Sequence, residues 1–190
     1  KLRFEESLAI GTTLELGSGE DAPVVAARLL CGTAPGTPFP ESNLRVATTR
    51  GTNALLEGKG EPVDLITSVG FESLLEIRDQ RRPELFELSP SIAIPVTRRV
   101  MGVPGRCDRR GVEIEELDLG VLEGFRPGAA VAVALLNADQ APVHEQRVAN
   151  FLGELGCHHP SISHELAPVI RLWPRMETAV ANAYLSPIMG

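Results

Sequence analysis

The sequence of 190 residues predicts an α/β fold with a largely parallel or mixed sheet and flanking helices. Short apolar segments with strand character alternate with segments whose apolar residues recur at helical spacing, which is the pattern of strand–helix units. Residues 129–136 are apolar on both faces, as is typical of an interior strand in a sheet covered on both sides. The chain is long enough to bury a real core, and we expect residues 1–190 to form a single domain.

The first predicted helix lies between Ser18 and Gly32. The run from Ser18 to Pro23 supplies cap candidates, acidic residues for the first turn and a proline near the first helical position. Gly32 then stops the helix. Two short strands, residues 2–4 and 12–16, are predicted before this helix as a hairpin edge, and a connector rich in proline and glycine, residues 33–43, follows it.

Two strand–helix units are predicted next. Strand 44–47 runs directly into helix 53–57, which two glycines end. Strand 63–67 is followed by Ser68 as a helix cap candidate. The apolar face of that second helix consists of Phe71, Leu74, Leu75 and Ile77.

The second half begins with a proline-rich connector, residues 83–95, and continues with strands and helices. Strands 96–103 and 112–114 are predicted to join around residues 108–111, a turn with glycine where a positive φ is expected. After strand 129–136 we predict a helix over residues 143–155. Pro174 opens the last helix, and Ser186-Pro187 closes it.

Composition excludes several classes of protein. The formal charge of −7 argues against nucleic acid as a partner, because phosphate binding needs a concentrated basic face. Cys31, Cys107 and Cys157 are far apart, so neither a zinc site nor a disulfide scaffold is supported. No apolar run approaches membrane-spanning length. We therefore expect a cytoplasmic protein without nucleic-acid or membrane partners.

The segment 44–60 carries the strongest functional signal. Its strand–turn–helix pattern gathers hydroxyls and an amide at a helix N-terminus, where unpaired N–H groups and peptide dipoles favour an anion. The alternative is that these side chains only cap the helix and shape the turn. The residues concerned are Thr48, Thr49, Thr52 and Asn53.

Four segments resemble the hydantoinase A/5-oxoprolinase family and occur in the family's order. They are residues 48–57 (Thr-Thr-Arg-Gly-Thr-Asn-Ala-Leu-Leu-Glu), residues 70–88, residues 144–148 (His-Glu-Gln-Arg-Val) and residues 163–185. Within the family, Pro174-Arg175-x-x-Thr178-Ala179 and residues 17–23 resemble 5-oxoprolinases more than acetone carboxylase subunits.

The resemblance implies an actin-like, ribonuclease H-like ATPase subdomain in an ATP-dependent hydrolase of cyclic amides. The foremost reaction is that of 5-oxoprolinase, in which 5-oxoproline, ATP and water give glutamate, ADP and phosphate; the other is that of N-methylhydantoinase. Phosphorylation of the amide oxygen would make the carbonyl carbon open to attack by water. The implied cofactors are ATP and Mg²⁺, which would act by positioning and by charge neutralisation.

The chain also departs from the family pattern. It lacks the Asp-x-Gly-Gly-Thr-Phe-Thr-Asp phosphate loop, Ala47 stands where the family has glycine, and Val46 stands where it often has histidine. It stops at Gly190, where family proteins continue. We therefore expect a piece of a larger protein that does not hydrolyse ATP unaided. Its partners would be the remaining domains of the same enzyme or a hydantoinase B-like subunit. The alternative is a non-catalytic assembly module of a multi-subunit complex.

The resemblance assigns two groups of site residues. The first group, expected to contact a phosphate or the substrate amide, is Thr48, Thr49, Thr52 and Asn53. The second group, expected to bind the substrate, is Arg78, Gln80, Arg81, His164, Glu165, Arg175 and Thr178.

The chemistry of the second group suits an anionic or polar substrate. The arginine guanidinium binds carboxylates and phosphates through two parallel hydrogen bonds. For residues 78–81 the alternative is that they form a solvated helix end with local salt bridges. His164 and Glu165 are expected at a strand end, where polar residues line clefts in α/β sheets. For His144-Glu145 at the start of a helix a structural role is favoured, because an acidic residue suits the first turn; a functional role is the alternative. A metal site beside Cys157 is not expected, because adjacent residues rarely bind one ion with good geometry.

Overall fold

The computed structural model describes residues 19–43, 45, 49–79, 96–157 and 159–189. The chain divides into two compact units, residues 1–48 and 49–190. The predicted strands 2–4 and 12–16, most of the predicted strand 44–47 and the connector 83–95 lie outside the described residues. The single domain expected from the sequence stays a prediction.

Helix α1 (Ala22–Cys31) belongs to the first unit and lies where the sequence predicts a helix. Pro23 lies in its first turn, and Gly32 ends it with a φ of 66°. Arg28 ties the helix to its flanking segments: its guanidinium pairs with Glu20 at 2.7 Å and donates to two carbonyl oxygens of the following loop.

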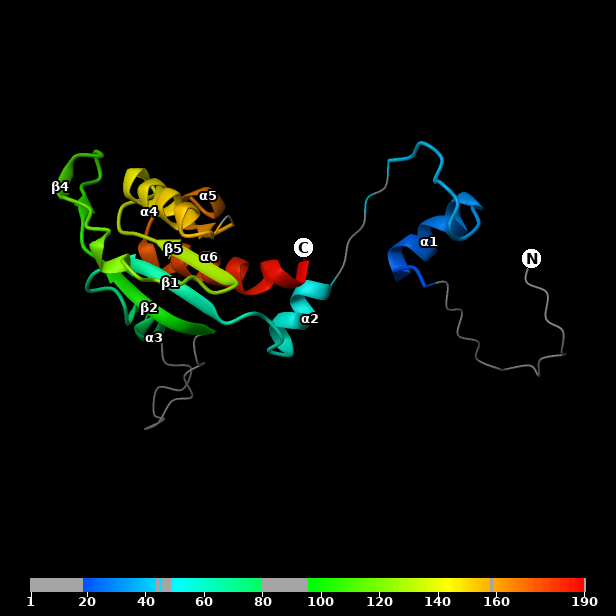
Figure 1. Cartoon of the computed structure of the whole chain (residues 1–190), viewed down its shortest axis with the longest axis horizontal. Coiled ribbons are helices and arrows are strands. Elements are labelled where there is room, and N and C mark those ends of the chain that lie inside the picture. Colours follow the sequence, from blue (N-terminus) through cyan, green and yellow to red (C-terminus); the bar gives the residue numbers. More distant parts are fainter. Residues whose placement is uncertain (1–18, 44, 46–48, 80–95, 158, 190) are drawn as a thin grey trace, which may run out of the picture. The chain divides into compact units, whose positions relative to one another are not determined.

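The second unit is built on a four-stranded parallel sheet in the order β2-β1-β5-β6 (Figure 1). The strands are β1 (Val63–Ser68), β2 (Thr97–Val103), β5 (Ala130–Ala134) and β6 (Ser161–Ile162). The helices are α2 (Arg50–Leu56), α3 (Leu74–Ile77), a 3₁₀ helix (Gly120–Leu122), α4 (Val143–Glu154), α5 (Ser163–Leu166) and α6 (Leu172–Met189). The predicted α/β fold with flanking helices is confirmed.

Strand β5 separates two apolar cores, as its sequence predicts. Ala130, Ala132 and Ala134 face α6, whereas Val131 and Val133 pack with Val148 and Leu152 of α4 on the other face. Side chains alternate across a strand, so a run that is apolar throughout serves both faces. The three alanines carry only methyl groups, which leaves room for α6 to pack close to the sheet.

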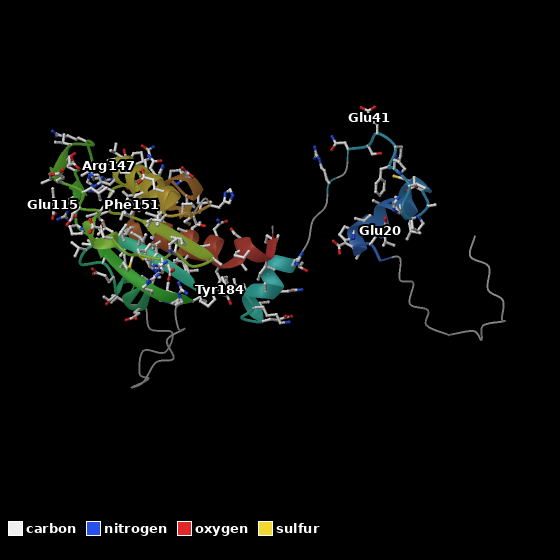
Figure 2. The ribbon with its side chains drawn as sticks, in the orientation of Figure 1. Glu20, Glu41, Glu115, Arg147, Phe151 and Tyr184 are labelled. Carbon is white, nitrogen blue, oxygen red and sulfur yellow. The ribbon has the colours of Figure 1, made fainter. Side chains whose placement is uncertain are left out.

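The approach to β1 is fixed by a contact between Gly60 and α6. The Glu61 N–H donates to the Tyr184 carbonyl oxygen at 3.0 Å, and Tyr184 lies in the second half of α6 (Figure 2). A Cβ on Gly60 would stand 2.0 Å from the Tyr184 ring. Only glycine therefore fits this close approach of the chain to the ring.

A small antiparallel pair lies beside the main sheet. Strands β3 (Arg106–Cys107) and β4 (Glu113–Glu115) pair around a turn in which Gly111 has a φ of 83°. The turn is the predicted one, but the predicted pairing of strands 96–103 and 112–114 is wrong. The longer strand instead joins the parallel sheet as β2, and residues 106–107 supply the partner of β4.

Several predicted helix ends are also corrected. Ser68 does not cap a helix: it ends β1, and its hydroxyl accepts a hydrogen bond from the Leu136 N–H at 2.9 Å. Helix α6 begins at Leu172 and continues past Pro187 to Met189. A proline in the last turn removes only one backbone hydrogen bond there, so Ser186-Pro187 does not close the helix.

Candidate functional site

The carboxyl ends of β1 and β5 meet where the strand order of the sheet reverses. Strand β2 lies on one side of β1 and β5 on the other. The connection after β1 carries α3 on the face covered by α6, and the connection after β5 carries α4 on the opposite face (Figure 1). In open α/β sheets, ligands bind outside the carboxyl ends of the strands at such a point. This edge, called here the carboxyl edge, is the candidate site.

Polar side chains hold the carboxyl ends of β1 and β5 and the segment that follows β5. The Thr67 hydroxyl donates to the Ala134 carbonyl oxygen at 2.9 Å, and the Ser68 hydroxyl accepts from the Leu136 N–H. Asn137 has a φ of 59°, and its side-chain amide donates to the Cys107 carbonyl oxygen. The strand ends are thus held by side chains rather than by further sheet pairing.

Glu145 of α4 is the central carboxylate of this edge. Its side chain is 0% exposed, and four donors surround it. Oε1 accepts from the Leu135 N–H at 2.7 Å and from the Ser163 hydroxyl at 2.6 Å. Oε2 lies 3.0 Å from the His164 N–H and 2.7 Å from His164 Nδ1. These bonds satisfy a buried carboxylate that would otherwise be costly to bury.

Arg175 of α6 reaches the same point from the other face of the sheet. Its side chain is 1% exposed. One terminal nitrogen pairs with Asp139 at 2.7 Å, and the other donates to the Leu135 carbonyl oxygen at 2.5 Å. Its Nε lies 3.3 Å from the Ser163 hydroxyl. The hydrogen-bonding groups of Arg175 are therefore bound to other residues of the protein, and its side chain is not exposed on the surface.

His164 is the member of this network that still reaches solvent. Its side chain is 13% exposed, and the residue directly follows the end of β6. Nδ1 is taken up by Glu145, whereas Nε2 has no hydrogen-bond partner among the described residues. The network thus fixes the ring and leaves one ring nitrogen available at the carboxyl edge.

The other predicted residues of α5 and α6 behave differently. Glu165 is exposed and lines a groove of about 820 Å³ along β6, between α4 and α6. Thr178 is exposed, and its hydroxyl donates to the Pro174 carbonyl oxygen of its own helix at 2.9 Å. Neither side chain joins the Glu145 network in the described structure.

The predicted turn residues lie on α2, near the other end of α6. Thr49 precedes the helix without a capping hydrogen bond from its side chain, and the side chains of Thr52 and Asn53 are exposed. A Cβ on Gly51 would meet Met189 of α6 at 3.5 Å, which places the start of α2 against the end of that helix. Thr48 lies outside the described residues.

Arg78 lies near the predicted residues of α2 but not near those of the carboxyl edge. It has a φ of 54° and lines a hollow of about 340 Å³ together with Leu55 of α2 and Glu177 of α6. Gln80 and Arg81 lie outside the described residues. Arg78 therefore shares a hollow with α2, whereas His164 and Arg175 belong to the carboxyl edge at the start of α6.

Two further charge clusters are separate from the Glu145 network. Asp64 near the start of β1 is 1% exposed and binds Arg98 at 2.6 Å and Arg99 at 3.0 Å. Burial raises the pKa of Asp64, but the two guanidinium groups and the Gly128 N–H outweigh burial and leave that pKa lowered. This cluster ties β1 to β2 and to the segment before β5.

The second cluster holds the β3–β4 hairpin to α4. Nε2 of the buried His144 lies 2.7 Å from Glu113, and Arg147 lies 3.2 Å from the same carboxylate. Figure 2 shows Arg147 on α4 near the hairpin that carries Glu115. The hydrogen bond with His144 is the main reason that the pKa of Glu113 is lowered.

The described residues offer no metal centre and no membrane-spanning helix. Within this part of the chain, no three histidine, cysteine or acidic side chains are grouped so that they could hold a metal ion. None of its helices is long and apolar enough to cross a membrane.

Sequence reasoning missed the role of several residues of the carboxyl edge. Glu145 was assigned to the helix dipole, yet it binds the ends of β5 and β6. Ser163 and Asp139 bind Glu145 and Arg175, and the sequence does not predict either contact. One feature of the sequence points to the contact of Glu145 with Ser163: residues 144–148 and residues 163–185 both belong to the family resemblance. Motifs on separate elements can meet at one edge of a sheet.

Three comparisons bear on this arrangement. Residues 13–156 match the family model of the hydantoinase/oxoprolinase N-terminal region. A 5-oxoprolinase 1 of Arabidopsis thaliana is 31% identical over 205 residues, which cover 90% of this chain and 16% of the relative. The caprolactamase subunit alpha of Pseudomonas jessenii is 35% identical over 156 residues, which cover 75% of this chain and 22% of the relative.

A solved structure shares the fold. The crystal structure of the ATP-dependent caprolactamase from Pseudomonas jessenii matches with a TM-score of 0.70 and 26% identity, covering 92% of this chain and 28% of that chain. The chain thus spans only a minor part of the length of the relatives that it matches.

Proposed function

The chain belongs to the hydantoinase/oxoprolinase family, and we propose that it is part of an ATP-dependent hydrolase of cyclic amides. The names of its relatives support this proposal, because 5-oxoprolinase and ATP-dependent caprolactamase both denote enzymes that open a cyclic amide. We further propose 5-oxoproline as the substrate and glutamate, ADP and phosphate as the products. N-Methylhydantoin is the second substrate candidate.

One structural observation carries this proposal. A buried network of Glu145, Ser163, His164 and Arg175 occupies the carboxyl edge next to the point where the strand order reverses. Buried and fully hydrogen-bonded charged groups at this position hold polar side chains in fixed geometry, as a site for a polar substrate requires.

We propose ATP as the co-substrate, which would activate the amide carbonyl by phosphorylation. The described residues do not fit a Mg²⁺ site. Glu145 is surrounded by four protein donors, and Asp139 is paired with Arg175. We therefore assign no step of the reaction to a metal bound by these residues.

The proposed substrate-contacting residues fall into two regions. On α2 and the turn before it they are Thr48, Thr49, Thr52 and Asn53, with Arg78, Gln80 and Arg81 beyond β1. At the carboxyl edge and on α6 they are His164, Glu165 and Thr178. Arg175 is proposed to act indirectly, because its side chain holds Leu135 and Ser163. The remaining domains of the same protein or a second subunit are the proposed partners.

The test uses the full-length gene product. ADP release is measured with 5-oxoproline, N-methylhydantoin or caprolactam, each with and without ATP, and ring-opened product is measured in parallel. We expect ATP-dependent ring opening of one of these amides. Absence of ring opening with all three would contradict the proposed function and leave an assembly role for the family fold.

Variants of the full-length protein test the residues of α2. Thr49→Ala and Asn53→Ala should lower kcat/KM for the amide, and Ser73→Ala, at another exposed position before a short helix, should not. Unchanged kcat/KM in both α2 variants would remove these residues from the site without removing the function.

A further inference from the structure

We propose that Nε2 of His164 accepts the proton of the water that attacks the amide carbon, and that Glu145 positions His164 for this step. The inference rests on the proposed function and adds a named proton acceptor to it.

The imidazole of His164 is held in one orientation and one tautomer. Glu145 is a buried acceptor, and Nδ1 lies 2.7 Å from its Oε2. The ionised carboxylate can only accept, so the proton of a neutral ring is placed on Nδ1. The lone pair of the neutral ring then lies on Nε2. The backbone N–H of His164 binds the same carboxylate oxygen, which fixes the residue at two points.

Nε2 is the ring nitrogen that can meet a substrate. It has no hydrogen-bond partner in the part of the chain that the structure describes, and the side chain keeps 13% of its surface exposed. The residue follows β6, whose neighbour β5 borders the point of reversal. A neutral imidazole with one nitrogen oriented by a carboxylate and the other at a ligand-binding edge is the arrangement of a general base.

The other charged groups near His164 do not compete for Nε2. Arg175 approaches from α6 but binds the Ser163 hydroxyl, the Leu135 carbonyl oxygen and Asp139. Asp139 is taken up by this guanidinium. His144 on α4 is unsuited to the role, because its Nε2 is bound to Glu113 at 2.7 Å.

The step balances without a further reagent beyond the ATP of the proposed function. The water oxygen forms a bond to the activated amide carbon, and the π electron pair of that carbon moves onto the adjacent heteroatom. The O–H bond of the water breaks, and its proton moves to Nε2. Glu145 stays ionised and stabilises the imidazolium that forms.

The experiment measures steady-state ring opening by the full-length gene product and its variants. His164→Gln should lower kcat by about 10²- to 10⁴-fold, the usual contribution of a general base, with KM nearly unchanged. His164→Ala should recover part of its lost kcat when imidazole is added to the assay. His159 is exposed, lies in the segment before β6 and has no role in the network, so the control variant His159→Gln should turn over like wild type.

Glu145→Gln tests the positioning role. The glutamine amide carries no negative charge, so it cannot stabilise the imidazolium that forms on His164 during proton transfer. The variant should lose kcat with little change in KM, provided that its circular dichroism matches that of wild type. His164→Gln, at a partly exposed position, keeps the inference testable if Glu145→Gln does not fold.

The outcomes separate the inference from the function. If wild type opens none of the amides, the proposed function fails and the inference fails with it. If wild type is active and His164→Gln keeps its kcat, the function stands and the inference is overturned. Loss of kcat in His164→Ala without recovery by imidazole also counts against a proton-transfer role.

Discussion

Glu145 and Arg175 hold the two backbone groups of a single residue, Leu135, from opposite faces of the sheet. The Glu145 carboxylate accepts the Leu135 N–H at 2.7 Å, and the Arg175 guanidinium donates to the Leu135 carbonyl oxygen at 2.5 Å. The two side chains also share the Ser163 hydroxyl. Strand β5 therefore ends at a point fixed by one helix from each layer.

Arg175→Met should destabilise the protein strongly. The change leaves the Asp139 carboxylate, whose side chain is 6% exposed, without its guanidinium partner. Removing one partner of a buried ion pair costs about 3–5 kcal/mol of the free energy of unfolding. Urea denaturation measures the loss. Thr178→Ala, an exposed change on the same helix, should stay within about 0.5 kcal/mol of wild type.

Ser163→Ala should cost less and should not add to the first change. The hydroxyl donates to Glu145 and accepts from Arg175, and loss of a buried hydrogen-bonding partner costs about 1–3 kcal/mol. Because the two residues share a network, the double variant Ser163→Ala/Arg175→Met should lose less than the sum of the single variants. Strict additivity in urea denaturation would show that the network is not coupled.

Gly60→Ala should destabilise the protein although glycine to alanine is a small change. The new methyl group would stand 2.0 Å from the Tyr184 ring, and forced overpacking costs about 1–3 kcal/mol. Gly153 offers a matched control in α4, because no atom lies within 4 Å of an added Cβ there. Gly153→Ala should be stabilising by about 0.5–1 kcal/mol. Thermal unfolding compares the two.

Asp64 should govern part of the stability in acid. Its pKa is lowered in the folded protein because Arg98, Arg99 and the Gly128 N–H outweigh burial. The stabilisation is therefore present above the unfolded pKa of about 3.9 and is lost as the pH falls through the lower folded pKa. Urea denaturation measured from neutral pH down to that range should show that the free energy of unfolding falls less steeply with pH in Asp64→Asn than in wild type.

The partner of Asp64 supplies the control for this prediction. Arg98→Gln should reduce the acid dependence in the wild-type background but not in the Asp64→Asn background, because the carboxylate that it stabilises is then gone. If adding Arg98→Gln to Asp64→Asn still changed how the free energy of unfolding falls in acid, the effect of Arg98 would have to come from another carboxylate.

Cys31 and Cys107 should differ in reactivity toward iodoacetamide. Cys31 is exposed, whereas Cys107 is buried, and burial raises the pKa of the Cys107 thiol. The thiolate is the reacting form, so Cys107 should be alkylated only after unfolding, and Cys31 should be alkylated in the native protein. Mass spectrometry of digested samples measures both. Rapid native alkylation of Cys107 would contradict its burial.

Much of the fold follows from local sequence. Pro23 and Gly32 frame α1, and the unbroken apolar run at 129–136 predicts the interior strand β5. These elements are set by local backbone chemistry and by burial on both faces. Ser68 could not be placed in the same way, because a serine after an apolar strand fits a helix cap as well as a strand end. Its partner Leu136 is distant in sequence.

The candidate site was harder to predict for the same physical reason. His164 was expected at a strand end and lies there, but its carboxylate partner is Glu145, on a separate helix, and not the neighbouring Glu165. Arg175 was expected to reach a substrate, whereas the structure buries it against Leu135. Contacts of this kind depend on how helices are placed over the sheet, and side-chain type alone does not determine that placement. The α2 residues Thr49, Thr52 and Asn53 stay predictions.

The double hold on Leu135 has a consequence for local motion. Its amide proton is bound to a carboxylate that is itself held by the start of α5, and its carbonyl oxygen is bound to a helix on the other face. Because Glu145 is fully buried and bound by several donors, exchange of this proton for deuterium should follow the cooperative opening of the whole unit. The end of this strand, ordinarily among the first places to loosen, is therefore expected to exchange as slowly as the middle of the sheet.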